Sequence, residues 1–275
     1  TLPGKSEVMQ KPRWRHLTWW KDHIGDRLLA DVTPSLLAEY RDKLAKGERS
    51  PRSPATVVRY MAALSHAFSI AVKEWEWLDD SPLRKVSKPK EPRGRVRFLS
   101  DDEREILLVA CKQSKAPYLY PLVVLALSTG ARRGELLGLT WGDIDLNRKV
   151  AILHKTKNEE RRALPLTGHA LGCIKELAEI RRIDTNLLFP DETGKKPVEI
   201  RPAWERVLKE TGIEDFKFHD LRHSAASYLA MNGASLAEIA EVLGHKTLQM
   251  VKRYSHLSEQ HTADVVSRMN KKIFG

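Results

Sequence analysis

A histidine and an arginine three residues apart are the first side chains of this sequence whose spacing suggests chemistry. They stand in His219-Asp220-Leu221-Arg222, and this spacing places both on one face of a helix, where they can contact one ligand. A guanidinium offers planar, permanently charged donors that match a phosphate, and an imidazole titrates near neutral pH. Such pairs are also common as solvated or carboxylate-paired surface residues, so the tetrapeptide alone leaves both interpretations open.

Three further segments stand before and after this pair. The segment TGARRGELLGLTW contains Arg132 directly after an apolar helix, LGH ends at His245, and RYSH contains Tyr254. Taken singly, Tyr254 suits a half-buried aromatic with a hydrogen-bonded hydroxyl, and Arg133 suits a surface charge. A surface role is less suitable for Arg132, because the apolar helix lies next to it.

In their order along the chain, these motifs resemble the signature of the tyrosine recombinase and phage integrase family, which is Arg, Lys, His-x-x-Arg, His or Trp, and Tyr. The resemblance runs from about residue 98 to residue 257. It implies a site-specific DNA recombinase, or integrase, that cleaves and rejoins DNA strands through a 3′-phosphotyrosyl intermediate. The catalytic residues that it implies are Arg132, Lys157, His219, Arg222, His245 and Tyr254.

The implied roles of these residues follow from the negative charge of a phosphodiester. Arg132 and Arg222 would clamp the scissile phosphate and hold the extra charge of the transition state, and His245 would add a donor. The resemblance assigns the nucleophile to Tyr254, with His219 assisting the removal of its proton. Since one phosphoester replaces another, we expect no nucleotide cofactor and no metal ion.

A lysine and three carboxylates complete the implied site. Lys157 would protonate the departing 5′ oxygen. Lys155 stays an alternative, because a shift of two residues in a hairpin presents the same face. Glu135, Asp143 and Asp220 match acidic positions of the family, where orienting the arginines or capping helices suits them better than reacting.

The charge of the chain agrees with a polyanionic partner. Its 275 residues carry a formal net charge of +11, which favours double-stranded DNA, and the resemblance implies a homo-oligomer, a tetramer on paired sites. No apolar run approaches the roughly 20 residues that cross a bilayer, and no signal-peptide pattern is present. We therefore expect a cytoplasmic, bacterial or phage-encoded, nucleoid-associated protein without a membrane partner. Cys111 and Cys173 form no ligand cluster, so neither a disulfide framework nor a zinc site is expected.

The composition also divides the chain. Residues 1–90 read as an all-helical domain, residues 91–97 as a basic linker, and residues 98–275 as a second domain with a C-terminal tail. The expected fold class is mainly α with a small antiparallel sheet. The resemblance implies an N-terminal core-binding (SAM-like) DNA-binding domain and an α+β integrase catalytic domain of the DNA breaking-rejoining fold.

Apolar periodicity, capping residues and glycines predict the individual elements. Trp75 is assigned to the apolar stripe of the second helix, and Ser100 with Glu103 predicts a capping box. Val265, Val266, Met269 and Ile273 lie along one potential helical face of the tail. Helices are expected near residues 33–47, 56–77, 118–127, 169–181, 201–210, 219–231, 235–243 and 248–256, and strands near 150–153 and 163–166, with 187–189 as the candidate third strand.

Two other functions are compatible with parts of the sequence. The segment from Ser224 to Tyr254 also resembles a helix-turn-helix with a glycine turn, as in a noncatalytic DNA-binding regulator. That function gives no reason for the motifs at Arg132 and Lys157. A type IB topoisomerase would use the same chemistry, but the helical domain before the linker is more similar to that of integrases.

Overall fold

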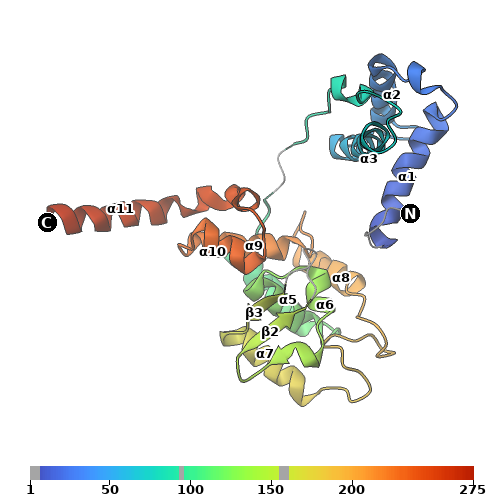
Figure 1. Cartoon of the computed structure of the whole chain (residues 1–275). Coiled ribbons are helices and arrows are strands. Elements are labelled where there is room, and N and C mark those ends of the chain that lie inside the picture. Colours follow the sequence, from blue (N-terminus) through green and yellow to red (C-terminus); the bar gives the residue numbers. More distant parts are fainter. Residues whose placement is uncertain (1–6, 93–95, 155–160) are drawn as a thin grey trace. The chain divides into compact units, whose positions relative to one another are not determined.

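The computed structural model describes residues 7–92, 96–154 and 161–275, without the side chains of 7–11, 258–262, 264 and 265. The chain divides into two compact units, residues 1–94 and 95–275 (Figure 1), and this boundary falls inside the segment 91–97. The described part is mainly helical with one small antiparallel sheet, which confirms the predicted fold class.

The first unit is a helical bundle in which two α-helices begin at clear capping signals. Thr33 accepts a hydrogen bond from the backbone N–H of Leu36, and Ser53 accepts one from Thr56. In both cases a proline follows in the first turn, where its missing N–H costs nothing. The elements are α1 (Glu7–Ile24), η1 (Leu29–Asp31), α2 (Pro34–Lys46), α3 (Pro54–Lys73) and η2 (Pro82–Lys85).

Helix α3 supplies much of the core of this unit. By length and composition alone α3 could cross a membrane. However, Val57, Met61 and Phe68 are buried in the bundle, where Leu37 and Trp20 are buried as well. The indole of Trp20 donates to the carbonyl oxygen of Tyr60 at 2.9 Å. This helix is therefore used to hold the unit together.

The predicted end of α3 is wrong. The helix stops at Lys73 rather than Trp77, because the chain turns at Glu76, which has a positive φ of 51°. Trp75 consequently lies outside the apolar stripe. It is 52% exposed and its ring packs against Trp77, with 4.4 Å between the ring centroids.

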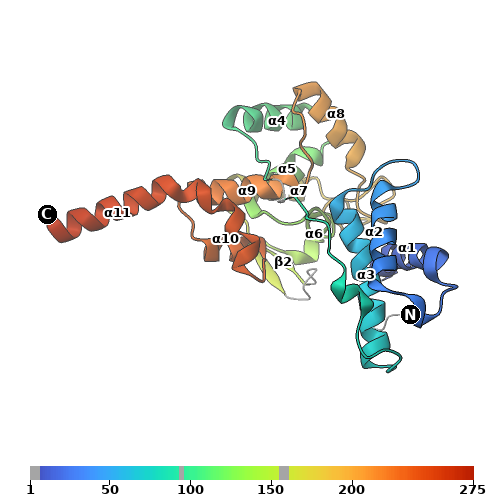
Figure 2. The ribbon, with the colours of Figure 1, turned by 90° about the horizontal axis from the view of Figure 1, so that it is seen from above.

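The second unit is built around the apolar helix α5, which is buried along most of its length. It packs against α4, α7 and α9, while α4 and α8 lie side by side (Figure 2). The predicted capping box at Ser100 and Glu103 is confirmed at the start of α4. The helices are α4 (Asp101–Gln113), α5 (Leu119–Thr129), α6 (Arg133–Leu137), α7 (Gly168–Glu179), α8 (Arg201–Thr211), α9 (Asp220–Met231), α10 (Leu236–Leu243) and α11 (Glu259–Phe274), with short 3-10 turns η3 (Trp141–Asp143), η4 (Leu248–Met250) and η5 (Lys252–Ser258).

The sheet has the strand order β1-β2-β3 and is antiparallel throughout. Its strands are β1 (Ile144–Asp145), β2 (Val150–Leu153) and β3 (Arg162–Pro165). Pro165 lies on the edge strand β3, as predicted, where its missing N–H interrupts no ladder. The third strand expected at 187–189 is wrong, since Leu187 makes only an isolated bridge to Thr140 and β1 takes that place.

The end of the chain also differs from the prediction. A single α-helix over 248–256 is wrong, because η4 and η5 are two 3-10 segments separated at Val251, whose side chain is fully buried. Tyr254 therefore lies on a 3-10 turn that packs against α9. In α11, the described apolar side chains of Val266, Met269 and Ile273 are between 46% and 61% exposed.

Candidate active site

Arg132 lies at the start of the short helix α6, directly after the turn that ends α5. Gly130 makes that turn with a φ of +59°, and a Cβ there would lie 2.5 Å from the side chain of Leu243. Both the conformation and the space require glycine. The Arg132 guanidinium donates to Glu135 Oε1 at 2.6 Å, and the backbone N–H of Arg132 donates to Glu135 Oε2 at 2.9 Å.

Arg222 lies on α9 and is only 4% exposed. It donates to the carbonyl oxygen of Gly130 at 2.7 Å and to that of Leu243 at 2.6 Å. One guanidinium thus joins the turn before Arg132 to the turn before His245. Burial, reinforced by the positive charges of Arg132 and Arg162, lowers the pKa of Arg222 to about 10, so the side chain stays protonated at neutral pH.

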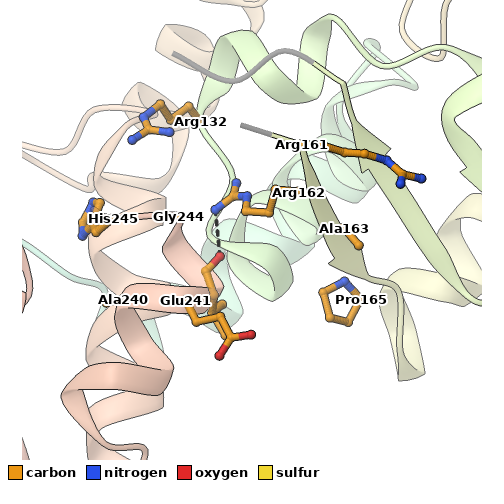
Figure 3. A pocket seen from close by; sticks show the side chains of 10 residues that line it. Arg132, Arg161, Arg162, Ala163, Pro165, Ala240, Glu241, Gly244 and His245 are labelled. Atoms are coloured by element: carbon orange, nitrogen blue, oxygen red, sulfur yellow. Dashed lines mark hydrogen bonds between the residues drawn. The ribbon is translucent and has the colours of Figure 1, made fainter. Parts of the chain in front are cut away.

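Arg132 and His245 line one pocket together with Arg162 of β3 (Figure 3). The pocket has a volume of about 490 Å³, and its other lining residues belong to β3 and α10 or directly adjoin them, as Arg161 and Gly244 do. The ring nitrogen Nδ1 of His245 is buried without a hydrogen-bond partner in the described part of the chain. Burial and then the charges of Arg222 and Arg132 lower the pKa of His245 to about 4, which keeps its imidazole neutral.

Tyr254 does not line this pocket. Its side chain is 1% exposed, and its hydroxyl is hydrogen-bonded to Nδ1 of His223 at 2.5 Å. Burial raises the pKa of Tyr254, with Arg253 and Arg222 acting against that rise. Burial and the neighbouring His219 lower the pKa of His223 to about 4. The hydroxyl is therefore a protonated phenol beside a neutral imidazole.

His219 stands at the N-cap of α9, one turn before His223. The two imidazoles make an edge contact, with 5.7 Å between ring centroids. Partial desolvation of the ring and then the charge of Arg222 lower the pKa of His219. His223 thus contacts both the ring of His219 and the hydroxyl of Tyr254.

The three carboxylates singled out from the sequence have different partners. Glu135 is 7% exposed at its side chain and bonds the arginine side chains of this site. Asp143 caps η3 by accepting from the backbone N–H and the hydroxyl of Thr140, both at 2.7 Å, and lies 3.2 Å from His154. Asp220 accepts from the backbone N–H of Lys217 at 2.8 Å. Glu135 thus contacts Arg132 and Arg162, Asp143 caps η3, and Asp220 caps the turn at Lys217.

Lys155 and Lys157 lie outside the described residues. The strands β2 and β3 that lead into and out of their segment are in register, with Leu153 opposite Arg162. The choice between the two lysines therefore stays a prediction.

Sequence reasoning missed two side chains that belong to this group. Arg162 contacts Glu135 and the last turn of α10, and His223 holds the hydroxyl of Tyr254. Both stand next to assigned motifs, in ERRALPL and HDLRHS. The available signal was a histidine four residues after His219, hence on the same helix face. For Arg162, the signal was its position on the strand after the hairpin lysines.

Comparison with known proteins identifies the family of the chain. Residues 97–261 match the model of the family described as phage integrase family. The chain is 31% identical over 237 residues to the integrase of Salmonella phage P22 and 35% identical over 240 residues to the shufflon-specific DNA recombinase of Escherichia coli. These matches cover 82% and 85% of the chain but only 59% and 60% of the relatives, so the chain spans about 60% of their length.

A solved structure extends the likeness to the fold. The Tn1549 transposon integrase in complex with transposon right end DNA matches with a TM-score of 0.80. The match covers 97% of this chain and 95% of that one at 18% sequence identity. At this identity the likeness shows the fold of the chain.

The two neutral histidines predict a pH dependence of stability. With pKa values of about 4 for His223 and His245, against about 6.5 when unfolded, the unfolded chain binds more protons between these values. Stability should therefore be complete above about pH 6.5 and be lost as the pH falls toward 4. The expected loss is at most about 1.4 kcal/mol per histidine for each pH unit.

Urea unfolding at about pH 7 and about pH 5 measures this loss. His223→Gln should lose less stability on acidification than the wild-type protein, whereas His256→Gln, which alters an exposed side chain, should behave as wild type. An equal loss in all three proteins would contradict the assignment of the neutral imidazole to His223.

Proposed function

This chain belongs to the phage integrase family, and on that premise we propose that it is a site-specific DNA recombinase that cuts and rejoins strands through a covalent bond to Tyr254. The observation that carries the proposal is the pocket lined by Arg132, Arg162 and His245, with the buried Arg222 bonded to the turns on either side of it. Fixed guanidinium groups in a desolvated site suit a phosphodiester, whose charge must be neutralised before an oxygen can attack.

In the first chemical step, the arginines and the nucleophile Tyr254 have separate roles. Arg132 and Arg222 hold the nonbridging oxygens of the scissile phosphate, and neutral His245 donates a further hydrogen bond. The Tyr254 oxygen forms a bond to phosphorus as the bond from phosphorus to the 5′ oxygen breaks. The proton of Tyr254 passes to the His219 and His223 pair, and Lys157 supplies a proton to the 5′ oxygen. The products are a 3′-phosphotyrosine and a free 5′ hydroxyl.

The DNA partner and assembly belong to the same proposal. The first unit is a core-binding domain that contacts duplex DNA together with the second, where phosphate contacts supply affinity and a few base contacts supply specificity. The carboxylates at the site, Glu135, Asp143 and Asp220, orient arginines or cap turns. Recombination proceeds in a tetramer on two DNA sites, in the cytoplasm of a bacterial cell, where the nucleoid supplies the substrate. The element that encodes the enzyme is bacterial or carried by a phage.

Tyr254→Phe should abolish the covalent adduct with DNA and leave the affinity for DNA nearly unchanged, because it removes one oxygen. The measurement uses a nicked suicide substrate with the ends of the element, denaturing electrophoresis and a protease digest of the adduct. Adduct formation by wild type should persist in excess EDTA, because the clamp is made of side chains. An undiminished adduct in Tyr254→Phe would exclude this nucleophile.

If wild type forms no adduct at all, a noncatalytic regulator is favoured, and relaxation of supercoils without partner exchange would favour a type IB topoisomerase.

Lys157→Ala should cut ordinary DNA slowly, because an unprotonated alkoxide is a poor leaving group. With a 5′-bridging sulfur in the substrate, the thiolate leaves without a proton, so this variant should regain most of the lost rate. Arg132→Ala is the control that sulfur should not rescue. Lys155→Ala, measured in parallel, decides between the neighbouring lysines. If sulfur rescues neither lysine variant, the general acid is another group.

Removing the tail from Thr262 onward should weaken cooperative assembly more than binding to a single site. The reason is that Val266, Met269 and Ile273 expose apolar surface in α11, which a neighbouring subunit would bury. Gel-shift titrations on single and paired sites measure both quantities. Replacing the same three residues with serine in the full-length chain separates lost contacts from lost length. Equal cooperativity with and without the tail would mean that the tail packs on its own domain.

A further inference from the structure

The carboxylate of Glu135 is shared by two arginines. Its Oε1 accepts from Arg132 Nη1 at 2.6 Å, and its Oε2 accepts from Arg162 Nη2 at 3.0 Å and from the backbone N–H of Arg132. The side chains of Glu135, Arg162 and Arg132 are only 7%, 13% and 22% exposed. One buried carboxylate therefore forms ion pairs with two guanidinium groups.

We infer that Arg162 is a positioning residue that takes up part of the charge and bonding capacity of Glu135, and thereby keeps Arg132 available to a phosphate. This inference rests on the proposed function of the pocket. It gives Arg162 a role that acts through Arg132 and needs no contact between Arg162 and DNA.

The charges of the three groups explain why a second arginine matters. With Arg162 present, one carboxylate stands between two guanidiniums, and the group keeps a net positive charge. Without Arg162, Glu135 and Arg132 form a neutral pair, and both carboxylate oxygens can turn to Arg132 in the bidentate geometry that guanidinium favours. In a partly buried site such a pair competes strongly with an incoming phosphate.

The surroundings of Arg162 hold its guanidinium beside Glu135. Its Nη1 donates to the carbonyl oxygen of Val242 in the last turn of α10 at 2.9 Å. Gly244 leaves room for the guanidinium, since a Cβ there would lie 2.6 Å from Nη1. The neighbouring Arg161 cannot substitute, because its exposed side chain points away from Arg162 (Figure 3).

A purely structural ion pair is the competing explanation. In that case Arg162 would only stabilise the contact between β3 and α10, and a neutral substitution would act by loosening that contact. The two explanations differ in the effect of neutralising Glu135 in the same chain. If the charge of Glu135 captures Arg132, removing that charge restores the clamp. If the contact is merely structural, removing a second partner restores nothing.

The experiment compares Arg162→Met, Arg162→Lys and the double variant Arg162→Met with Glu135→Gln. Single-turnover adduct formation on the suicide substrate, at saturating DNA, should fall about 100-fold in Arg162→Met, the loss typical of one transition-state donor. The double variant should recover to within about tenfold of wild type. Arg162→Lys, which keeps the charge, should retain most of the rate. An Arg162→Met rate equal to wild type, or a double variant no faster than Arg162→Met, would overturn the inference.

A second measurement does not depend on recombination. Inorganic phosphate should raise the Tm of the wild-type protein by binding the folded pocket. The rise should be smaller in Arg162→Met and should return in the double variant. If wild type forms no adduct but the phosphate series behaves in this way, the proposed function fails and the inference holds. If wild type forms the adduct but phosphate raises the Tm equally in all variants, the inference is overturned and the proposed function stands.

A surface ion pair provides the matched control, and a second substitution replaces Arg162→Met if that variant does not fold. Arg201→Met, alone and with Glu205→Gln, makes the same two changes in a surface ion pair of α8, whose side chains are 75% and 58% exposed. These controls should leave both readouts at the wild-type level. If Arg162→Met does not fold, Arg162→Gln removes the charge while keeping a donor for the Val242 carbonyl, and it enters the same comparison.

Discussion

The arrangement of this site depends on how the buried guanidinium of Arg222 is solvated. A buried charge must be hydrogen-bonded, and here the acceptors are the carbonyl oxygens of Gly130 and Leu243. These carbonyls stand at the C-terminal ends of α5 and α10, where the helix dipole is negative. Arg222 can therefore be buried while keeping its charge. The same two bonds bring together the turns that carry Arg132 and His245.

Burial, and after it the accumulated positive charge, lowers the pKa of the neighbouring histidines. His245 has Arg222 and Arg132 beside it, which together with burial keep its imidazole neutral. A protonated histidine would add repulsion to a cluster whose carboxylate, Glu135, is already divided between two arginines. The neutral ring can still donate one hydrogen bond to an anion. A bound phosphodiester would oppose the charges that depress these pKa values, so the histidines become better proton acceptors when substrate is present.

Much of this could be predicted from the sequence because it depends on local signals. The capping residues Thr33 and Ser100 and the apolar periodicity indicate helix starts, and the spaced motifs point to Arg132, Arg222, His245 and Tyr254. The cap at Ser53 was missed, and that helix begins at Pro54 rather than near residue 56. The contacts of Arg162 and His223 could not be predicted in this way, because their partners are 27 and 31 residues distant and depend on packing. Trp75 was misplaced because periodicity does not show where a helix stops. The 3-10 turns around Tyr254 replaced a helix because Val251 is buried between two short segments.

The two arginines and Tyr254 are held by unequal means. Arg132 and Arg222 are fixed by charge-assisted bonds to Glu135 and to helix-end carbonyls, on elements that belong to or adjoin the core. Tyr254 lies on a 3-10 turn, whose hydrogen bonds have poorer geometry than those of an α-helix. Its hydroxyl is bonded to His223, and such a bond contributes only about 1 kcal/mol net. Tyr254 is also packed in the small core that α9, α10 and η5 share. Under the proposed function it would have to leave that packing as well as the His223 bond to reach a phosphate, whereas the arginines are already in place.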